Sequence, residues 1–260
     1  MVVLDYELNL SATEFLLFSE CPQKFRLYRI LNPLPRKDVF LSSSNRTISS
    51  YELRRYDEDV VNKIKYHKFF ETFHETYAQV IHNTIPPKEI AEDDICLLYW
   101  HEQQKKYFEV EDLYYWYPVS KELKLMTENK RGKIDCLELC ENKNGLRLID
   151  YKPTPDLINQ LSLLFYASLF NEYREENPNE EEFELDILEI GCYYYEMGIK
   201  RVQNLKENKS QVFDRLFADT LGKIANEEFF INKSSCWNCN FKYFCKIEQK
   251  KQRIKDPSEI

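Results

Sequence analysis

Two aspartates and a lysine near the middle of the chain are spaced so that they can meet on one face of a β-hairpin. Within residues 132–152, GKIDCLELCENKNGLRLIDYK, a four-residue turn over residues 141–144 places Asp135 directly opposite Asp150. Directly opposed side chains have Cβ atoms about 5 Å apart, and like charges there destabilise the sheet. A divalent cation between the carboxylates relieves that repulsion, and oxygen ligands favour Mg²⁺ or Mn²⁺. Lys152, on the face of Asp150, can stabilise charge developing on a phosphate or orient an attacking water.

Two other interpretations of this hairpin stay open. The end of the hairpin can be solvated, with Lys152 simply neutralising the two aspartates. A tight turn at Asn144–Gly145 would also move the aspartates out of opposition. The pattern therefore predicts a metal site only if the longer turn forms.

Cysteines form a second group with metal-binding chemistry. CWNCNFKYFC holds Cys236, Cys239 and Cys245 in the spacing C-x2-C-x5-C. A closed metal site usually needs four protein ligands, and thiolates suit zinc or an iron–sulfur cluster. Cys21 is a candidate for the fourth, because it precedes a proline at a predicted helix start, where the helix dipole favours a thiolate. The remaining cysteines fit ordinary buried thiols: Cys96, Cys136, Cys140 and Cys192.

The elements that must position these residues are predicted from periodicity and capping signals. Ser11 and Glu14 form a capping-box pattern, and Pro22 fits the first position of a second helix. The order of helices, strands, helix, strand and helix predicts one α/β domain over residues 1–260, with a central mixed β-sheet flanked by helices. Helices are predicted over 11–20, 21–31, 52–83, 158–175 and 211–230, strands over 112–151 and 184–198, and a loop or insertion over 32–50.

The bulk properties exclude several classes of protein. The chain has five glycines and no G-x-G-x-x-G or Walker A pattern, which argues against a Gly-rich nucleotide-binding loop. It shows no signal-peptide pattern and no apolar run long enough to cross a bilayer, so we expect a cytoplasmic protein without a membrane role. The net charge of −8 is uneven, with basic stretches at 128–133 and 242–255 and an acidic block at 174–186.

The motifs GKID and LIDYK resemble the active-site signature of the PD-(D/E)XK nuclease superfamily, and most closely its RecB-like branch. The resemblance implies a restriction-endonuclease-like fold in which Asp135 and Asp150 bind the metal and Lys152 assists the water nucleophile. It also implies the backbone carbonyl of Tyr151 as a further ligand. The family uses a histidine from a preceding helix, and we prefer His74, in FHETY, over His67, which lies seven residues earlier on the same face.

The same resemblance extends to two further elements. The family carries a Q-x-x-x-Y motif on the helix after the active-site lysine, and Gln160 and Tyr166 are its weak counterparts, because a spacing of six puts them on different helix faces. CRISPR-associated RecB-like exonucleases and AddB share C-P-x-x-F near the start and C-x2-C-x5-C at the end of the nuclease domain. In them four cysteines hold a 4Fe–4S cluster, which implies that role here for Cys21, Cys236, Cys239 and Cys245.

A cluster held in this way would join the N-terminal helices, about 11–31, to the C-terminal segment, about 230–250, in an iron–sulfur subdomain. The alternatives are a structural zinc site on the same cysteines and no metal at all, although zinc ligands more often come as two close pairs. A lone remote cysteine fits the nuclease arrangement better. The cluster would then be structural rather than catalytic.

The function implied by the resemblance is hydrolysis of DNA by a Mg²⁺- or Mn²⁺-dependent exonuclease acting on single-stranded ends, in CRISPR adaptation or in recombination and repair. Its partners would be DNA and CRISPR integration proteins or a helicase. The alternatives are an inactive iron–sulfur DNA-binding subunit and an RNA-directed nuclease, for which the sequence offers no reader of a 2′-OH. Candidate DNA contacts are Tyr114, Tyr115, Trp116, Trp237, Lys121, Lys124, Lys130, Arg131, Lys133 and the basic tail.

Overall fold

The structure is a computed structural model of the 260-residue chain. It describes residues 9–31, 50–140, 144–156, 159–178 and 184–236, together with residues 239, 241 and 245. The predicted loop over 32–50, apart from its last residue, lies outside the described residues, as do Trp237 and nearly all of the basic tail. No helix in the described part of the chain is long and apolar enough to cross a membrane.

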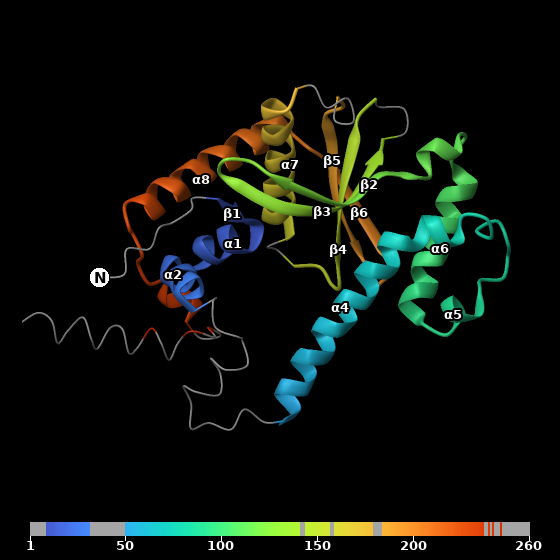
Figure 1. Ribbon diagram of the computed structural model, residues 1–260, viewed down its shortest axis with the longest axis horizontal. Helices are drawn as coiled ribbons and strands as arrows, with labels where there is room; N and C mark the ends of the chain where they lie inside the picture. Colours follow the sequence, from blue (N-terminus) through green and yellow to red (C-terminus); the bar gives the residue numbers. More distant parts are fainter. Residues whose placement is uncertain are drawn as a thin grey trace, which may run out of the picture.

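A mixed six-stranded sheet forms the centre of the fold, as the sequence predicted (Figure 1). The strand order is β1-β3-β4-β5-β6, and β2 pairs with β3 outside this path. The β1–β3 and β4–β5 pairs are parallel, whereas β2–β3, β3–β4 and β5–β6 are antiparallel. The strands are β1 (Leu10–Ser11), β2 (Pro118–Met126), β3 (Lys130–Leu139), β4 (Leu146–Lys152), β5 (Ile187–Tyr194) and β6 (Ile199–Asn204).

Helices cover both faces of this sheet (Figure 1). One core packs α1, α7 and α8 against the sheet around Phe15, Phe165 and Phe213, and the other packs α4 and α6 around Phe70 and Trp100. Two separate cores on one sheet make an α/β sandwich. The helices are α1 (Ala12–Glu20), α2 (Pro22–Leu31), α4 (Ser50–Tyr77), α5 (Lys88–Ala91), α6 (Asp94–Glu109), α7 (Asn159–Glu176) and α8 (Glu207–Ala225), with short 3-10 turns η1 (Leu113–Tyr115) and η3 (Lys233–Ser235).

The N-terminal signals act as the sequence predicted. The Ser11 hydroxyl accepts a hydrogen bond from the Glu14 backbone N–H, and the Glu14 carboxylate accepts one from the Ser11 N–H, which completes the capping box. Pro22 opens α2. Glu14 is buried, and Arg29 of α2 lies 2.7 Å from its carboxylate, so the capping residue also ties the two helices together.

Several elements differ from the sequence-based expectation. Helix α4 ends at Tyr77 rather than near residue 83. Val61 and Ile64 are exposed, because the N-terminal part of α4 extends beyond the sheet (Figure 1). Helix α6 and strand β6 were not predicted. Asp93 caps α6 by accepting hydrogen bonds from the Ile95 and Cys96 N–H groups, a start signal that the sequence contained.

The N-terminal helices lie beside the C-terminal end of the described chain. The backbone N–H of Asn232 donates to the Cys21 Sγ at 3.4 Å, and the Asn232 side chain donates to the Glu20 carbonyl at 2.9 Å. The Gln23 N–H donates to the Phe230 carbonyl at 3.2 Å. These contacts join segments more than two hundred residues apart in sequence.

Candidate functional site

The register of the β3–β4 hairpin is the one that the four-residue turn predicts. Leu137 pairs with Leu148, and the ladder continues towards the end where Asp135 and Asp150 lie in the same step. Residues 141–143 of the turn lie outside the described residues, but the pairing on either side fixes the count. The two aspartates are therefore brought together on one face, as the periodicity required.

The two carboxyl groups are buried and crowded. The Tyr151 backbone N–H donates to Asp135 Oδ2 at 2.8 Å, and Lys152 Nζ lies 2.8 Å from Asp150 Oδ2. Burial raises the pKa of Asp150 to about 7, the neighbouring Asp135 acts in the same direction, and Lys152 opposes both. One lysine does not offset two buried carboxyls, so the pair is short of positive charge.

Lys152 stays positively charged in this setting. Burial by itself would lower the pKa of its amine, but the ion pair with Asp150 and the charge of Asp135 raise it above its ordinary value. The lysine therefore presents a fixed cation beside the carboxylates.

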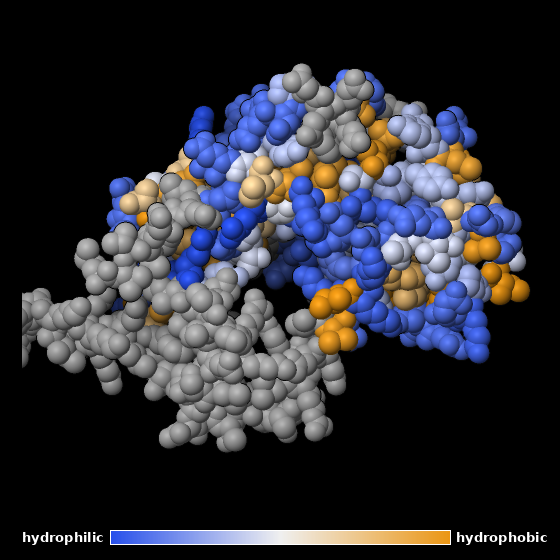
Figure 2. Space-filling view, viewed as in Figure 1, coloured by the Kyte–Doolittle hydropathy of each residue, from blue (hydrophilic) through white to orange (hydrophobic). Residues whose placement is uncertain are grey.

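A cleft of about 410 Å³ opens beside the carboxylates. Figure 2 shows the surface hollowed next to α4 and bordered mainly by hydrophilic side chains. Three strands and two helices contribute to its walls. The lining residues are Lys63, Ile64, His67, Lys68 and Glu71 of α4, Glu122 of β2, Lys133 and Asp135 of β3, Asp150 and Lys152 of β4, and Tyr166 of α7.

His67, rather than His74, is the histidine that faces the aspartates. Its Nδ1 lies 3.6 Å from Asp135 Oδ1 and 3.8 Å from Glu122 Oε1. Burial, together with the charge of Lys63, lowers the pKa of His67 to about 4, so the imidazole is neutral near pH 7. A neutral imidazole among carboxylate oxygens is a donor set that divalent metals accept.

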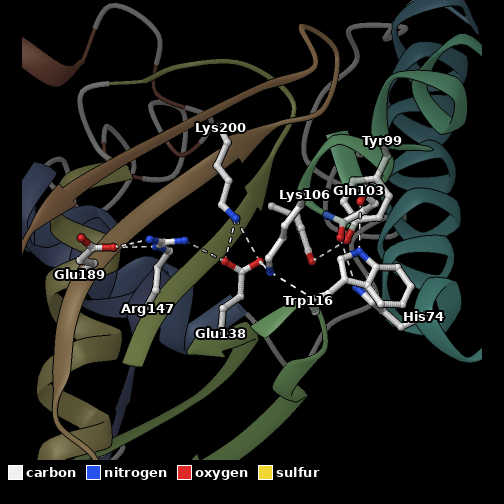
Figure 3. Close-up of polar contacts among 10 residues, drawn as sticks. His74, Tyr99, Gln103, Lys106, Trp116, Glu138, Arg147, Glu189 and Lys200 are labelled. Carbon is white, nitrogen blue, oxygen red and sulfur yellow. Dashed lines mark hydrogen bonds and ion pairs between the residues drawn. The ribbon is translucent and has the colours of Figure 1, made fainter. Parts of the chain in front are cut away.

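The preference for His74 is corrected by its position in the structure. His74 is buried against Trp116, and its Nε2 lies 3.2 Å from the Gln103 side-chain oxygen (Figure 3). Burial lowers its pKa to about 3. His67 and His74 share a helix face, but they lie about two turns apart, so only the earlier one reaches the carboxylate end of the strands.

Glu122 is a residue of the cleft that the sequence reasoning missed. Its carboxylate, the Asp135 carboxylate and a ring nitrogen of His67 all lie within 4.8 Å of one another, a grouping that could hold a metal ion. Lys133 forms an ion pair with Glu122 from the neighbouring strand. The signal was present, because counting back from the turn over residues 127–130 in the same way as for the β3–β4 hairpin sets Glu122 opposite Asp135.

The donor set fits a hard divalent cation. It consists of buried carboxylate oxygens and one neutral imidazole, with too little positive charge from the protein to balance them. A family comparison supports the same interpretation, since the family model of the PD-(D/E)XK nuclease superfamily matches residues 9–246. The chain belongs to the PD-(D/E)XK nuclease superfamily. Among curated proteins, none is similar enough to this chain to be reported as a relative.

Superfamily membership relates the cleft to phosphodiester hydrolysis. PD-(D/E)XK proteins are metal-dependent nucleases that hydrolyse phosphodiester bonds, and the matched segment includes all of the residues that line the cleft. The signature residues Asp135, Asp150 and Lys152 lie together at the cleft floor. The backbone of Tyr151 lies between them and bonds to Asp135, while its side chain is buried in the core on the other face.

Tyr166 reaches the nuclease cleft, and Gln160 does not. Burial raises the pKa of the Tyr166 hydroxyl, and the charges of Asp150 and Asp135 act in the same direction. Gln160 is exposed at the start of α7, as its spacing of six from Tyr166 indicated. The glycine of GKID explains the close packing here, because a Cβ on Gly132 would lie 2.9 Å from the Tyr166 ring.

Burial does not divide the cysteines into the two groups expected from the sequence. Cys21 is buried together with Cys96, Cys136, Cys140 and Cys192, whereas Cys236, Cys239 and Cys245 are partly exposed. Burial raises the pKa of Cys239, and the nearby charges of Cys21 and Cys236 add to this effect. Asn232 contacts two of the four cysteines of the expected cluster, because its N–H donates to the Cys21 Sγ at 3.4 Å and its carbonyl accepts from the Cys236 Sγ at 3.6 Å. The Cys245 N–H donates to the Phe241 carbonyl at 3.0 Å.

Some of the expected DNA contacts are corrected by burial. Lys130 is buried and forms an ion pair with Glu172, and Trp116 is completely buried. Neither side chain is free to contact a nucleic acid. Lys133 lines the cleft, and Tyr114 is exposed, so these two keep surface positions compatible with binding.

Proposed function

We propose that this protein is a Mg²⁺- or Mn²⁺-dependent deoxyribonuclease that acts as an exonuclease on single-stranded DNA ends. The observation that carries the proposal is the buried Asp135–Asp150 pair, with Lys152 2.8 Å from Asp150, at the floor of a cleft in a PD-(D/E)XK chain. Buried carboxyl groups whose charge is not fully balanced destabilise the folded state, and such groups concentrate at functional sites.

The cation would be held by Asp135, Asp150 and His67, with the Tyr151 carbonyl as a further ligand. When bound, it supplies Lewis-acid polarisation of the phosphate and activation of water. The remaining roles fall to side chains of the cleft. Lys152 positions the water and offsets negative charge on the phosphate, because its ion pair with Asp150 keeps it charged.

The walls of the cleft fit a polyanionic strand. Lys63 and Lys68 come from α4 and Lys133 from β3, so positive charge borders the carboxylates on two sides. Such lysines attract phosphates without reading sequence. Tyr166, which lines the same cleft from α7, is suited to fix a sugar or phosphate oxygen.

We further propose that Cys21, Cys236, Cys239 and Cys245 hold a 4Fe–4S cluster that joins residues 11–31 to 230–250 within a single domain. The contacts of Asn232 with both Cys21 and Cys236 support this assignment. Four thiolates suit an iron–sulfur cluster, and zinc on the same residues is the alternative. The pathway would be CRISPR adaptation or recombination and repair, with integration proteins or a helicase as partners.

The nuclease assignment is tested with anaerobically purified full-length protein and end-labelled single-stranded DNA in Mn²⁺ or Mg²⁺. Wild type should degrade linear strands, and Asp150→Ala and Lys152→Ala should each lose roughly 10²–10³-fold in rate. Lys88→Ala, at an exposed lysine of α5, is the matched control and should cut like wild type. Equal cleavage of circular strands would overturn the exonuclease mode, and equal cleavage by the Asp150 variant would overturn the site.

The cluster is tested separately by iron and sulfide analysis and by absorbance near 400 nm. Wild type should contain both elements, and Cys21→Ser should lose them. Cys192→Ser, at a buried thiol of β5, is the control that should keep them. If the protein is colourless and contains zinc, the four cysteines form a zinc site and not an iron–sulfur cluster.

A second function is favoured by one observation, the exposed position of Gln160 away from Tyr166. If the Q-x-x-x-Y element no longer functions, the protein is an iron–sulfur subunit that binds DNA and does not cleave it. DNA binding by wild type with no cleavage in either metal would select this alternative.

A further inference from the structure

Ile64 is the one aliphatic side chain among the described residues that line the nuclease cleft. The other lining residues are charged or carry a polar group, from Lys63 of α4 to Tyr166 of α7. Ile64 is nevertheless 65% exposed, and Val61, one turn earlier on α4, is 61% exposed. Residues three apart on a helix are neighbours on its surface. Val61 and Ile64 therefore form an apolar step that leads from the cleft towards the exposed N-terminal part of α4.

The apolar step begins beside the carboxylate end of the cleft. Ile64 precedes His67 by three residues, so the two side chains are neighbours on the helix surface. The His67 Nδ1 lies 3.6 Å from Asp135 Oδ1. One turn of helix advances by about 5.4 Å. A nucleotide next to the one whose phosphate lies at the carboxylates can therefore place its base on Ile64.

Lysines lie on both sides of Ile64 along α4. Lys63 precedes it directly, and Lys68 follows by one turn, and both line the cleft. Lys68 reaches Glu71 at 3.0 Å, in a pair that is exposed to solvent. An apolar side chain between two cations matches a strand in which phosphates alternate with bases, because the phosphates bind lysines and the bases present apolar faces. This charge complementarity favours a nucleic acid over an apolar protein surface as the occupant.

Only an unpaired base can use such a contact. In a duplex each base face is stacked on its neighbours, and proteins reach the base edges through the grooves. In a single strand the base can turn out and lay its face on a side chain. Aliphatic side chains, including isoleucine, make contacts of this kind where they unstack bases. The apolar area of Ile64 is then removed from water, which favours binding.

We propose that Ile64 is the contact for an unpaired base beside the cleaved phosphate, and that this contact gives the cleft its preference for single strands. The inference rests on the proposed function, because it takes a nucleic acid as the substrate. An aliphatic side chain neither transfers a proton nor holds a cation. Ile64 therefore acts in binding and specificity, and Val61 extends the same apolar surface.

The test measures equilibrium binding of labelled DNA to the anaerobic full-length protein in the presence of a chelator, so that nothing is cleaved. An oligothymidine strand is compared with an abasic strand of equal length, which keeps the phosphates and lacks every base. Ile64→Ser should weaken binding of oligothymidine about tenfold and leave binding of the abasic strand unchanged. Ile64→Leu keeps the apolar area and should bind like wild type. Ile85→Ser is the matched control, because Ile85 is 79% exposed and lies outside the cleft lining.

The abasic strand separates contact with a base from an indirect effect on the lysines. Unchanged binding of oligothymidine by Ile64→Ser, or equal weakening on both strands, would overturn the base contact. A blunt duplex should bind Ile64→Ser and wild type equally, and a tenfold loss there too would overturn the role in strand preference.

Cleavage in Mn²⁺ is scored separately and judges the proposed function. If wild type shows the expected binding pattern but cuts no strand, the nuclease proposal fails and the base contact stands. If Ile64→Ser binds like wild type while wild type cuts DNA, the base contact fails and the nuclease proposal stands. If wild type binds neither strand, both proposals are overturned.

Discussion

Two buried acids three residues apart on β3, Asp135 and Glu138, meet opposite electrostatic surroundings. Glu138 lies on the other face of the strand, with Lys200 at 2.7 Å, Lys106 at 3.1 Å and Arg147 at 3.5 Å (Figure 3). Burial by itself would raise the pKa of Glu138, but these three cations hold it well below its ordinary value. In the cleft, by contrast, burial and Asp135 raise the pKa of Asp150 to about 7.

The difference separates a structural network from a binding site. Glu138 joins α6, β4 and β6 because each contributes a cation to it, and Glu189 continues the network by pairing with Arg147 at 2.6 Å. The Glu138 network is complete without any ligand. In the cleft, the carboxylates of Glu122, Asp135 and Asp150 form ion pairs with only two lysines of the described residues, Lys133 and Lys152, so an added cation would complete their charge balance.

Removal of the Glu138 charge should have the largest effect on stability. Glu138→Gln leaves three cations around a buried neutral amide, and breaking a buried network in this way costs about 3–5 kcal/mol. The free energy of unfolding in urea should fall by that amount. Glu92→Gln, in an exposed pair with Lys88, is the control and should change it by less than about 1 kcal/mol. A fall of that small size for Glu138→Gln would mean that the network is not structural.

The histidines give a pH dependence with a defined sign. His74 has its pKa lowered to about 3 by burial, so the folded protein keeps it neutral while the unfolded chain protonates it below about pH 6.5. Its stabilising contribution is complete above that pH and is lost as the pH falls, at about 1.4 kcal/mol per pH unit. His67, lowered to about 4, adds the same sign, whereas Asp150, raised to about 7, acts in the opposite direction. His74→Gln should therefore reduce the slope of unfolding free energy between pH 6.5 and 5 by about 1 kcal/mol per pH unit.

An unchanged slope in His74→Gln would show that this ring is not buried in its neutral form. The exposed His101 offers the matched control, and His101→Gln should leave the slope as in wild type.

Close packing at the cleft wall gives a smaller effect. In Gly132→Ala the new methyl group would lie 2.9 Å from the Tyr166 ring and 3.1 Å from Leu169. Overpacking of this kind costs about 1–3 kcal/mol, and the displaced tyrosine should also slow cleavage. Gly222→Ala, in α8, meets nothing within 4 Å and should instead stabilise the protein by about 0.5–1 kcal/mol. Equal effects of the two substitutions on thermal unfolding would contradict the packing argument.

Asp150→Asn should change the free energy of unfolding least, and the sign of that change is informative. In metal-free protein, Asp150→Asn removes one of the crowded charges and loses the pair with Lys152, so the two effects oppose each other. The free energy of unfolding near pH 8 should stay within about 1 kcal/mol of wild type or rise. A fall as large as that of Glu138→Gln would place Asp150 in the same structural class as Glu138.

The sequence predicts the β3–β4 hairpin because two local rules suffice there. A period of two and one turn length set Asp135 opposite Asp150, and the observed register agrees. The same count of residues from the preceding turn, over residues 127–130, would have found Glu122. The capping box at Ser11 is local in the same sense and is also observed.

What the sequence leaves open depends on how elements meet in space. His67 and His74 share one helix face, and only the position of α4 along the sheet decides between them. Two of the three cations of Glu138 come from positions 32 and 62 residues away, so no local sequence pattern predicts the network. Burial likewise removes Lys130 and Trp116 from the expected DNA contacts.

The most direct test of this comparison measures unfolding of wild type, Asp150→Asn and Glu138→Gln as Mn²⁺ is added. A ligand that binds only the folded state stabilises it by about 2.7 kcal/mol at one hundred times its dissociation constant. Wild type and Glu138→Gln should gain this increment from their different starting values, and Asp150→Asn should gain clearly less. If Mn²⁺ does not raise the unfolding free energy of wild type, or raises that of Asp150→Asn equally, a cation site at Asp135 and Asp150 would be contradicted.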